Sequence, residues 1–151
     1  MFRALPSYGF YCRHVRDITF SNVRLSFEDS YWRLTTSEHR ETEWATKDGV
    51  PTPSKPGQAG YVFVGEDISG LHIDNLSARP ATEGTPMLRF DDVRNATVRG
   101  CAIPDDAKTF LEISGSRSSN VCIAGDNALQ NLANKIFVGK DTHPDSVRIT
   151  N

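Results

Sequence analysis

The chain has 151 residues, with 17 Lys and Arg, 19 Asp and Glu, and a formal net charge of −2. This length suits one domain with a buried core, and the balanced, scattered charge disfavours nucleic acid as a partner. No apolar run is long enough to span a bilayer, so we expect no membrane partner. Residues 1–6 show no apolar signal region, and the sequence leaves the localisation open.

Two kinds of short segment alternate along the chain. The first kind is an apolar run, found at Phe10–Cys12, Tyr61–Val64, Met87–Phe90, Phe110–Ile113 and Ile136–Val138. The second kind follows a few residues later and alternates apolar with mostly polar residues, at 17–22, 70–75, 95–100, 120–125 and 146–151. The second positions of these five segments are separated by steps of 53, 25, 25 and 26 residues.

The alternating segments align column by column. Because strand side chains alternate faces, the second and fourth columns should point into one core. These columns contain Ile18, Leu71, Ala96, Val121 and Val147, then Phe20, Ile73, Val98, Ile123 and Ile149. Three further apolar residues, Val15, Ile68 and Val93, recur three positions before the second column and should anchor a corner inside.

The closing column points to a repeated corner. It contains only Asn and Gly, the residues that most readily adopt a positive φ. We therefore expect left-handed backbone at Asn22, Asn75, Gly100 and Gly125.

A repeat of about 25 residues with paired strands is typical of stacked parallel repeats. The sequence thus predicts an all-β fold, a right-handed parallel β-helix (solenoid) of about five or six coils. It forms a single domain over 1–151 with one long inserted loop at 28–58. An antiparallel sandwich with regular strand spacing is the alternative fold.

The insertion at 28–58 has no repeat character and contains both tryptophans of the chain. Long loops on rigid scaffolds often carry binding function, and exposed aromatic rings suit the apolar face of a sugar. Tyr31, Trp32 and Trp44 are therefore candidate ligand-binding residues. The alternative is that they pack the loop against the scaffold. The acidic cluster around His39 is interpreted as a solvated charge cluster rather than a metal site.

The three cysteines, Cys12, Cys101 and Cys122, are an odd number without a close pair. A structural disulfide and a zinc site are both disfavoured by this spacing. Cys101 is expected to be a small core residue. The sequence predicts no metal and no cofactor.

Two stretches carry a family resemblance. Residues 5–23, and Arg89–Asn95 with Val98–Cys101, resemble the C-terminal coils of family 28 glycoside hydrolases, which are polygalacturonase-like right-handed parallel β-helix proteins. The resemblance covers most of the chain outside 28–58. It implies a carbohydrate-active context, with polysaccharide or oligosaccharide as a possible partner, and relatives that are usually secreted or periplasmic.

The family's catalytic motifs are mostly missing from this chain. The resemblance implies Asn-x-Asp, Asp-Asp, Gly-His-Gly and Arg-x-Lys motifs on successive coils, and only Asp91-Asp92 matches one of them. We therefore assign no catalytic residue and lean against an enzyme. The pair Arg13 and His14 is the best remaining candidate for ligand binding, although support of the corner explains it as well.

Three functions stay open. The first is a non-catalytic β-helix module or a fragment of a carbohydrate-active protein. The second is a carbohydrate-binding protein that uses the aromatic loop. The third is a hydrolase whose site is completed by oligomerisation, with Asp91, Asp92, Asp74, Glu112 and His72 as its polar groups. Because a solenoid exposes unpaired backbone at its ends, we expect a homo-oligomer formed through an end or through the inserted loop.

Overall fold

A computed structural model describes residues 7–26, 61–79, 86–102, 109–124 and 135–150 of the chain. The predicted insertion at 28–58 lies outside these residues, and with it Tyr31, Trp32 and Trp44. Gly125 also lies outside them.

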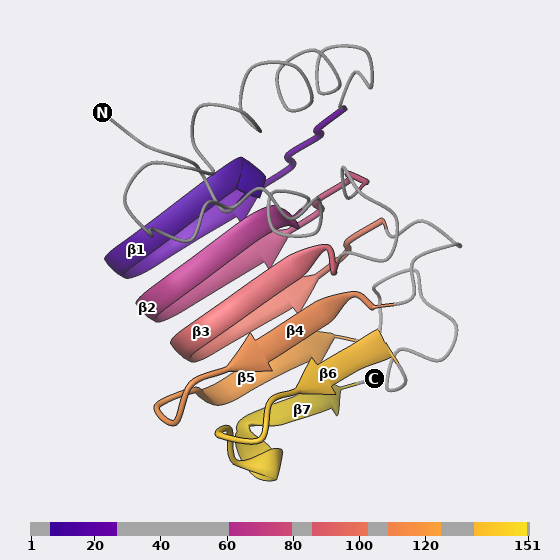
Figure 1. Ribbon diagram of the computed structural model, residues 1–151. Helices are drawn as coiled ribbons and strands as arrows, with labels where there is room; N and C mark the ends of the chain where they lie inside the picture. Colours follow the sequence, from indigo (N-terminus) through magenta and orange to yellow (C-terminus); the bar gives the residue numbers. More distant parts are fainter. Residues whose placement is uncertain (1–6, 27–60, 80–85, 103–108, 125–134, 151) are drawn as a thin grey trace, which may run out of the picture.

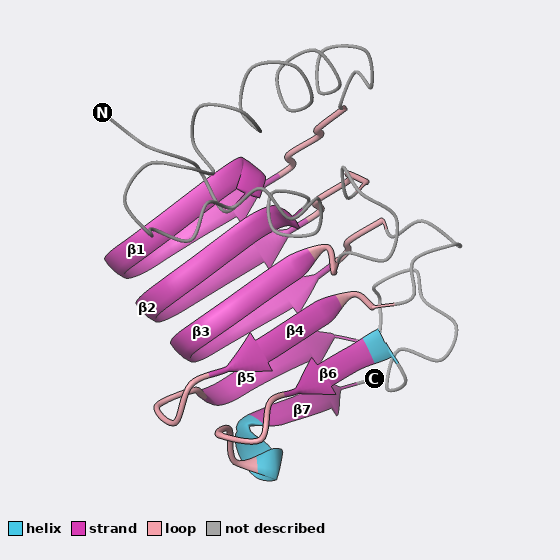
Figure 2. Ribbon diagram, viewed as in Figure 1, coloured by secondary structure: helices cyan, strands magenta, loops and turns pink. Residues whose placement is uncertain are grey.

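The described residues form seven strands and one short helix (Figures 1 and 2). The elements are β1 (Ser7–Ser21), β2 (Tyr61–Asp74), β3 (Leu88–Arg99), β4 (Leu111–Ser114), β5 (Ser119–Ala124), β6 (Ile136–Val138), the 3₁₀ helix η2 (Pro144–Ser146) and β7 (Val147–Thr150). All strands belong to one sheet, and every strand pairing in it is parallel. The all-β prediction is confirmed, and the antiparallel alternative is wrong.

The strand register reproduces the columns that the sequence predicts. The second column is paired across neighbouring strands in the order Ile18, Leu71, Ala96, Val121 and Val147. The fourth column is paired in the same way, in the order Phe20, Ile73, Val98, Ile123 and Ile149. A shift by one residue would turn every apolar column toward solvent, so burial of one face fixes this register.

Each long strand bends into two legs, which Figure 1 shows for β1, β2 and β3. The first leg of β3 pairs with β4 and its second leg pairs with β5. The ring of Phe20, on the second leg of β1, lies 4.8 Å from the ring of Phe10 and 5.3 Å from that of Phe63 (centroid to centroid), both on first legs. The core therefore lies between the two legs.

Burial of the core columns is complete only in the middle of the stack. Ile73 is fully buried, whereas Phe20 in β1 is half-buried and Ile149 in β7 is 40% exposed. The prediction of one uniform core is wrong at Ile149, because β7 pairs with β5 alone among the described strands. Cys101 is fully buried, as predicted, and all three cysteines are free thiols.

The corners adopt the predicted backbone conformation. Asn22, Asn75 and Gly100 have φ values of 56°, 54° and 63°. The Asn75 side chain donates to the Asn22 side-chain oxygen at 3.0 Å, so this corner also carries a hydrogen bond between repeats. Two further positive-φ columns were not predicted, and they contain His14, Asp67, Asp92 and Gly115, then Asp17, Gly70, Asn95 and Asn120.

We expect Gly100→Val to lower the free energy of unfolding by at least about 1 kcal/mol, because a β-branched residue is strained at positive φ. Gly100→Asn is the matched control, since Asn already occupies this column in three other repeats, at Asn22, Asn75 and Asn151. It should lose clearly less, although any Cβ here must displace the Asn75 amide. Urea denaturation of both variants measures the difference. Equal stability of wild type and Gly100→Val would contradict the corner assignment.

Candidate functional site

The corner between the first and second legs concentrates the charged side chains of the described chain. Equivalent positions in four successive repeats are taken by His14, Asp67, Asp92 and Gly115, all with positive φ. Asp and His tolerate this conformation better than most residues other than Asn and Gly. Since His14, Asp67 and Asp92 stand one repeat apart, each side chain can reach the next repeat.

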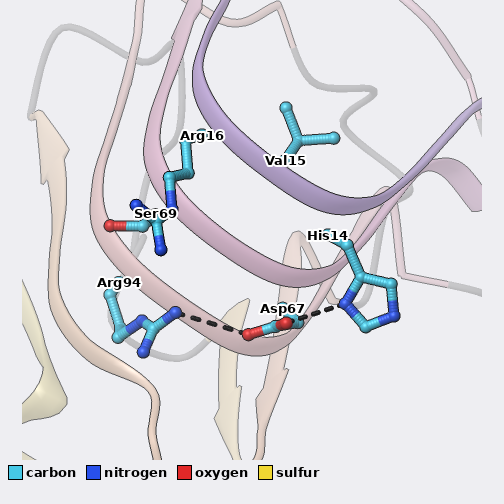
Figure 3. A pocket seen from close by; sticks show the side chains of 6 residues that line it. All are labelled: His14, Val15, Arg16, Asp67, Ser69 and Arg94. Atoms are coloured by element: carbon cyan, nitrogen blue, oxygen red, sulfur yellow. Dashed lines mark hydrogen bonds and ion pairs between the residues drawn. The ribbon is translucent and has the colours of Figure 1, made fainter.

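Asp67 is the centre of this corner. Its carboxylate lies 2.8 Å from His14 Nδ1, 3.3 Å from Arg94 Nη2 and 3.3 Å from Arg117 Nη2. Figure 3 shows the carboxylate between the His14 ring and the Arg94 guanidinium. The His14 hydrogen bond, with the charges of Arg117, His14 and Arg94, holds the pKa of Asp67 below its usual value.

Asp92 is held by one neighbour, Arg117. The carboxylate accepts hydrogen bonds from Arg117 Nε at 3.1 Å, from Nη2 at 2.8 Å and from the backbone N–H at 3.0 Å. These contacts lower the pKa of Asp92. Gly115 makes the arrangement possible, because a Cβ there would collide with the Asp92 carboxylate.

Asp91 differs from Asp92 in its surroundings. Burial, followed by the negative charge of Asp92, raises the pKa of Asp91. The two neighbouring carboxylates thus have shifted pKa values in opposite directions. Such a separation is found in acid–base pairs but also in structural ion pairs, and here the ionised member is bound to an arginine.

The other acidic candidates also have structural partners. Asp74 forms an ion pair with Arg99 Nε at 2.6 Å. Glu112 accepts a hydrogen bond from the Tyr61 hydroxyl at 2.9 Å, and burial with this bond raises the pKa of Tyr61 to about 12.

His72 is exposed on the outward third column of β2, two residues before Asp74 on the same strand, and no hydrogen bond or ion pair joins it to the described acidic candidates. The structure does not gather it into one cluster with the acidic candidates.

The candidate pair Arg13 and His14 contacts two different carboxylates. Arg13 Nε lies 3.6 Å from Glu66 Oε2, and this oxygen also accepts a hydrogen bond from the Tyr11 hydroxyl at 2.7 Å. His14 instead contacts Asp67, as described above. Both residues therefore link β1 to β2, as expected for side chains that support the corner. Only His14 also lines a hollow of the surface.

That hollow has a volume of about 210 Å³ and lies beside Asp67 (Figure 3). It is lined by His14, Val15, Arg16, Asp67, Ser69 and Arg94. Sequence reasoning singled out His14 alone as a ligand-binding residue of this set. A signal for the others exists, because Arg16, Ser69 and Arg94 each stand one position before the first column and pair with one another in register.

No group of three His, Cys, Asp or Glu side chains in the described part of the chain is placed to hold a metal ion. No helix among the described residues is long and apolar enough to cross a membrane.

The Asp92–Arg117 contact predicts a dependence of stability on pH. Because the folded pKa of Asp92 is below the unfolded value near 3.8, its stabilisation is complete above that value. It is lost as the pH falls below 3.8 through the folded pKa.

Asp92→Asn keeps a residue suited to positive φ but removes the charge. We expect a lower melting temperature than wild type at pH 7, and a smaller gap at pH values below the unfolded pKa. Thermal melts followed by circular dichroism measure both. A gap that does not depend on pH would contradict the ion pair's contribution.

Comparisons with protein-family models, with curated proteins and with solved structures found no match in any of the three.

Proposed function

We propose that the chain is a non-catalytic module of a right-handed parallel β-helix, similar to the C-terminal coils of family 28 glycoside hydrolases. In this proposal each repeat is one coil, and the stack is a scaffold within a carbohydrate-active protein. The supporting observation is the in-register parallel pairing of five repeats around a core enclosed between two legs.

The corner columns support the same proposal. A coil that closes on itself must turn sharply between strands, and positive φ at equivalent positions of successive repeats provides such turns. Two asparagine contacts follow the stacking direction, Asn22 with Asn75 and Asn95 with Asn120. Turns of the same backbone conformation, stacked at equivalent positions, are expected in a β-helix whose coils are nearly identical.

The state of the carboxylates supports a non-catalytic role. An inverting glycosidase needs one carboxyl group as acid and one free carboxylate as base, separated by roughly 6.5–9.5 Å. Here Asp91 and Asp92 are consecutive residues, and Asp92 already accepts three hydrogen bonds from Arg117. A carboxylate that is bound in this way is poorly placed to activate water.

We expect no release of reducing sugar when the purified chain is incubated with polygalacturonate. Wild type and Asp92→Asn should give the same background signal, since neither has a free catalytic base at this position. Release by wild type that Asp92→Asn abolishes would overturn the non-catalytic proposal.

The same samples test the second candidate, carbohydrate binding by the aromatic loop. The observation in its favour is that both tryptophans of the chain, Trp32 and Trp44, lie in the insertion near Tyr31. Intrinsic tryptophan fluorescence therefore reports on this loop alone. A saturable change on titration with oligogalacturonates would favour binding, and an unchanged spectrum favours the scaffold.

The two ends of the described stack carry incompletely buried core columns. At one end, Phe10 and Phe20 in β1 are half-buried, and at the other, Ile136 and Val138 in β6 are half-buried and Ile149 in β7 is 40% exposed. Successive coils present the same cross-section, so the last coil of one copy matches the first coil of another. We include in the proposal a homo-oligomer formed through these ends.

We expect light scattering at micromolar concentration to give a mass above that of the monomer. Ile149→Lys places a charge in the end surface and should shift the mass toward the monomer. Arg148→Glu, which alters an exposed neighbour on the outward face, is the control and should leave the mass unchanged. A strictly monomeric wild type would contradict association through the ends.

A further inference from the structure

The hollow beside Asp67 contains cationic groups that the corner does not use. Arg16 is exposed and has no hydrogen-bond or ion-pair partner among the described residues, unlike Arg13 and Arg94, which contact carboxylates. Its side chain reaches toward Ser69 in Figure 3. Arg16 therefore places a guanidinium at the edge of the hollow that no described residue binds.

The strand register places two arginines on either side of a small residue. Arg16, Ser69 and Arg94 pair in register on β1, β2 and β3. Neighbouring strands lie about 4.8 Å apart, so the two arginines are separated by about 9.6 Å along the stack. Ser69 is short, and the space above it is the hollow itself. This backbone spacing, with only a serine between the two arginines, leaves room for a group of a few atoms beside Ser69.

Arg94 also has an unsatisfied donor. Its Nη2 contacts Asp67, but its Nε is buried and has no hydrogen-bond partner. A buried N–H without an acceptor is unfavourable, and native structures usually provide one. Arg94 lines the hollow and its side chain is 37% exposed, so a ligand in the hollow can supply the acceptor that this residue lacks.

The charge of the hollow favours a negative ligand. Among the described residues that line it, Asp67 is the only acidic one, and its charge is shared by His14, Arg94 and Arg117. Arg16 adds a positive charge that no described carboxylate neutralises. The sum over the described lining residues Arg16, Asp67 and Arg94 is therefore positive, even with His14 neutral.

We propose that this hollow binds an oxyanion group, as found in carboxylate, sulfate and phosphate. The oxygens accept hydrogen bonds from the Arg16 and Arg94 guanidinium groups, which match planar or tetrahedral oxyanions in geometry, and from the Ser69 hydroxyl. The group comes either from a free ion or from an acidic substituent on a sugar. This site is independent of the proposed scaffold role, and it uses none of the residues of the aromatic loop.

The test is a titration of the chain with inorganic phosphate, sulfate and acetate, followed by NMR of the arginine Nε–H signals. We expect saturable shifts of the Arg16 and Arg94 signals. Arg16→Gln should weaken binding about tenfold or more, because it removes charge-assisted hydrogen bonds. Ser69→Val fills the hollow without changing the charge and should weaken binding to a similar extent.

The matched control is Arg148→Gln, which removes the same charge from an exposed residue of β7 and should bind like wild type. Circular dichroism of each variant confirms that the fold is retained. Shifts that never saturate, or equal weakening by Arg16→Gln and Arg148→Gln, would overturn the proposal, because both indicate only the general charge of the surface.

Two further titrations distinguish the sources of the oxyanion, using glucuronate and uncharged glucose. Tighter binding of glucuronate than of acetate assigns the site to an acidic sugar. Equal binding of the two assigns it to the free ion. Binding of glucose as tight as that of glucuronate would contradict recognition of an oxyanion.

Discussion

The in-register parallel pairing of successive repeats is the constraint on which the rest of the structure depends. Once Leu71 stands beside Ile18 and Ala96, each turn must also stand above the corresponding turn of the next repeat. One backbone conformation is then required in every repeat. The positive φ shared by Asn22, Asn75 and Gly100 is the direct result.

The same pairing creates the charged corner. Side chains that project at a corner have their nearest neighbours one repeat above and below. Asp67 therefore contacts His14 in one direction and Arg94 in the other, while Asp92 contacts Arg117 in the next repeat. These contacts fix the turns of successive repeats against one another, so Asp67 and Asp92 both have a structural role at this corner. The hollow above Ser69 is left where a short residue interrupts the arginine column.

The strand register and the positive φ of one corner column could be predicted from the sequence, because apolar alternation and an Asn or Gly column are strong local signals. The other two corner columns were missed. Asp and His also occur widely outside left-handed backbone, so Asp67 and His14 gave no clear signal. The ion pairs depend on side-chain reach between repeats, which alignment of columns alone does not provide.

The burial of Ser118 and the exposure of Ile149 both depart from what their residue types predict. Ser118 takes the position of the inward Val93 in its repeat and is buried, because its hydroxyl accepts from the Val93 N–H and donates to the Ser114 carbonyl. The polar side chain of Ser118 does not by itself predict that this residue is buried. Ile149 has the right residue type for the core, yet its exposure depends on which strands flank β7.

The most direct test of the account is solution NMR of the isotope-labelled chain, which reads strand order and backbone conformation together. Nuclear Overhauser contacts should connect the methyl groups of Leu71, Ala96 and Val121 in that order. Coupling constants at Asn22 and Asn75 should report positive φ. Contacts that reverse the strand direction, or negative φ at both asparagines, would contradict in-register parallel stacking.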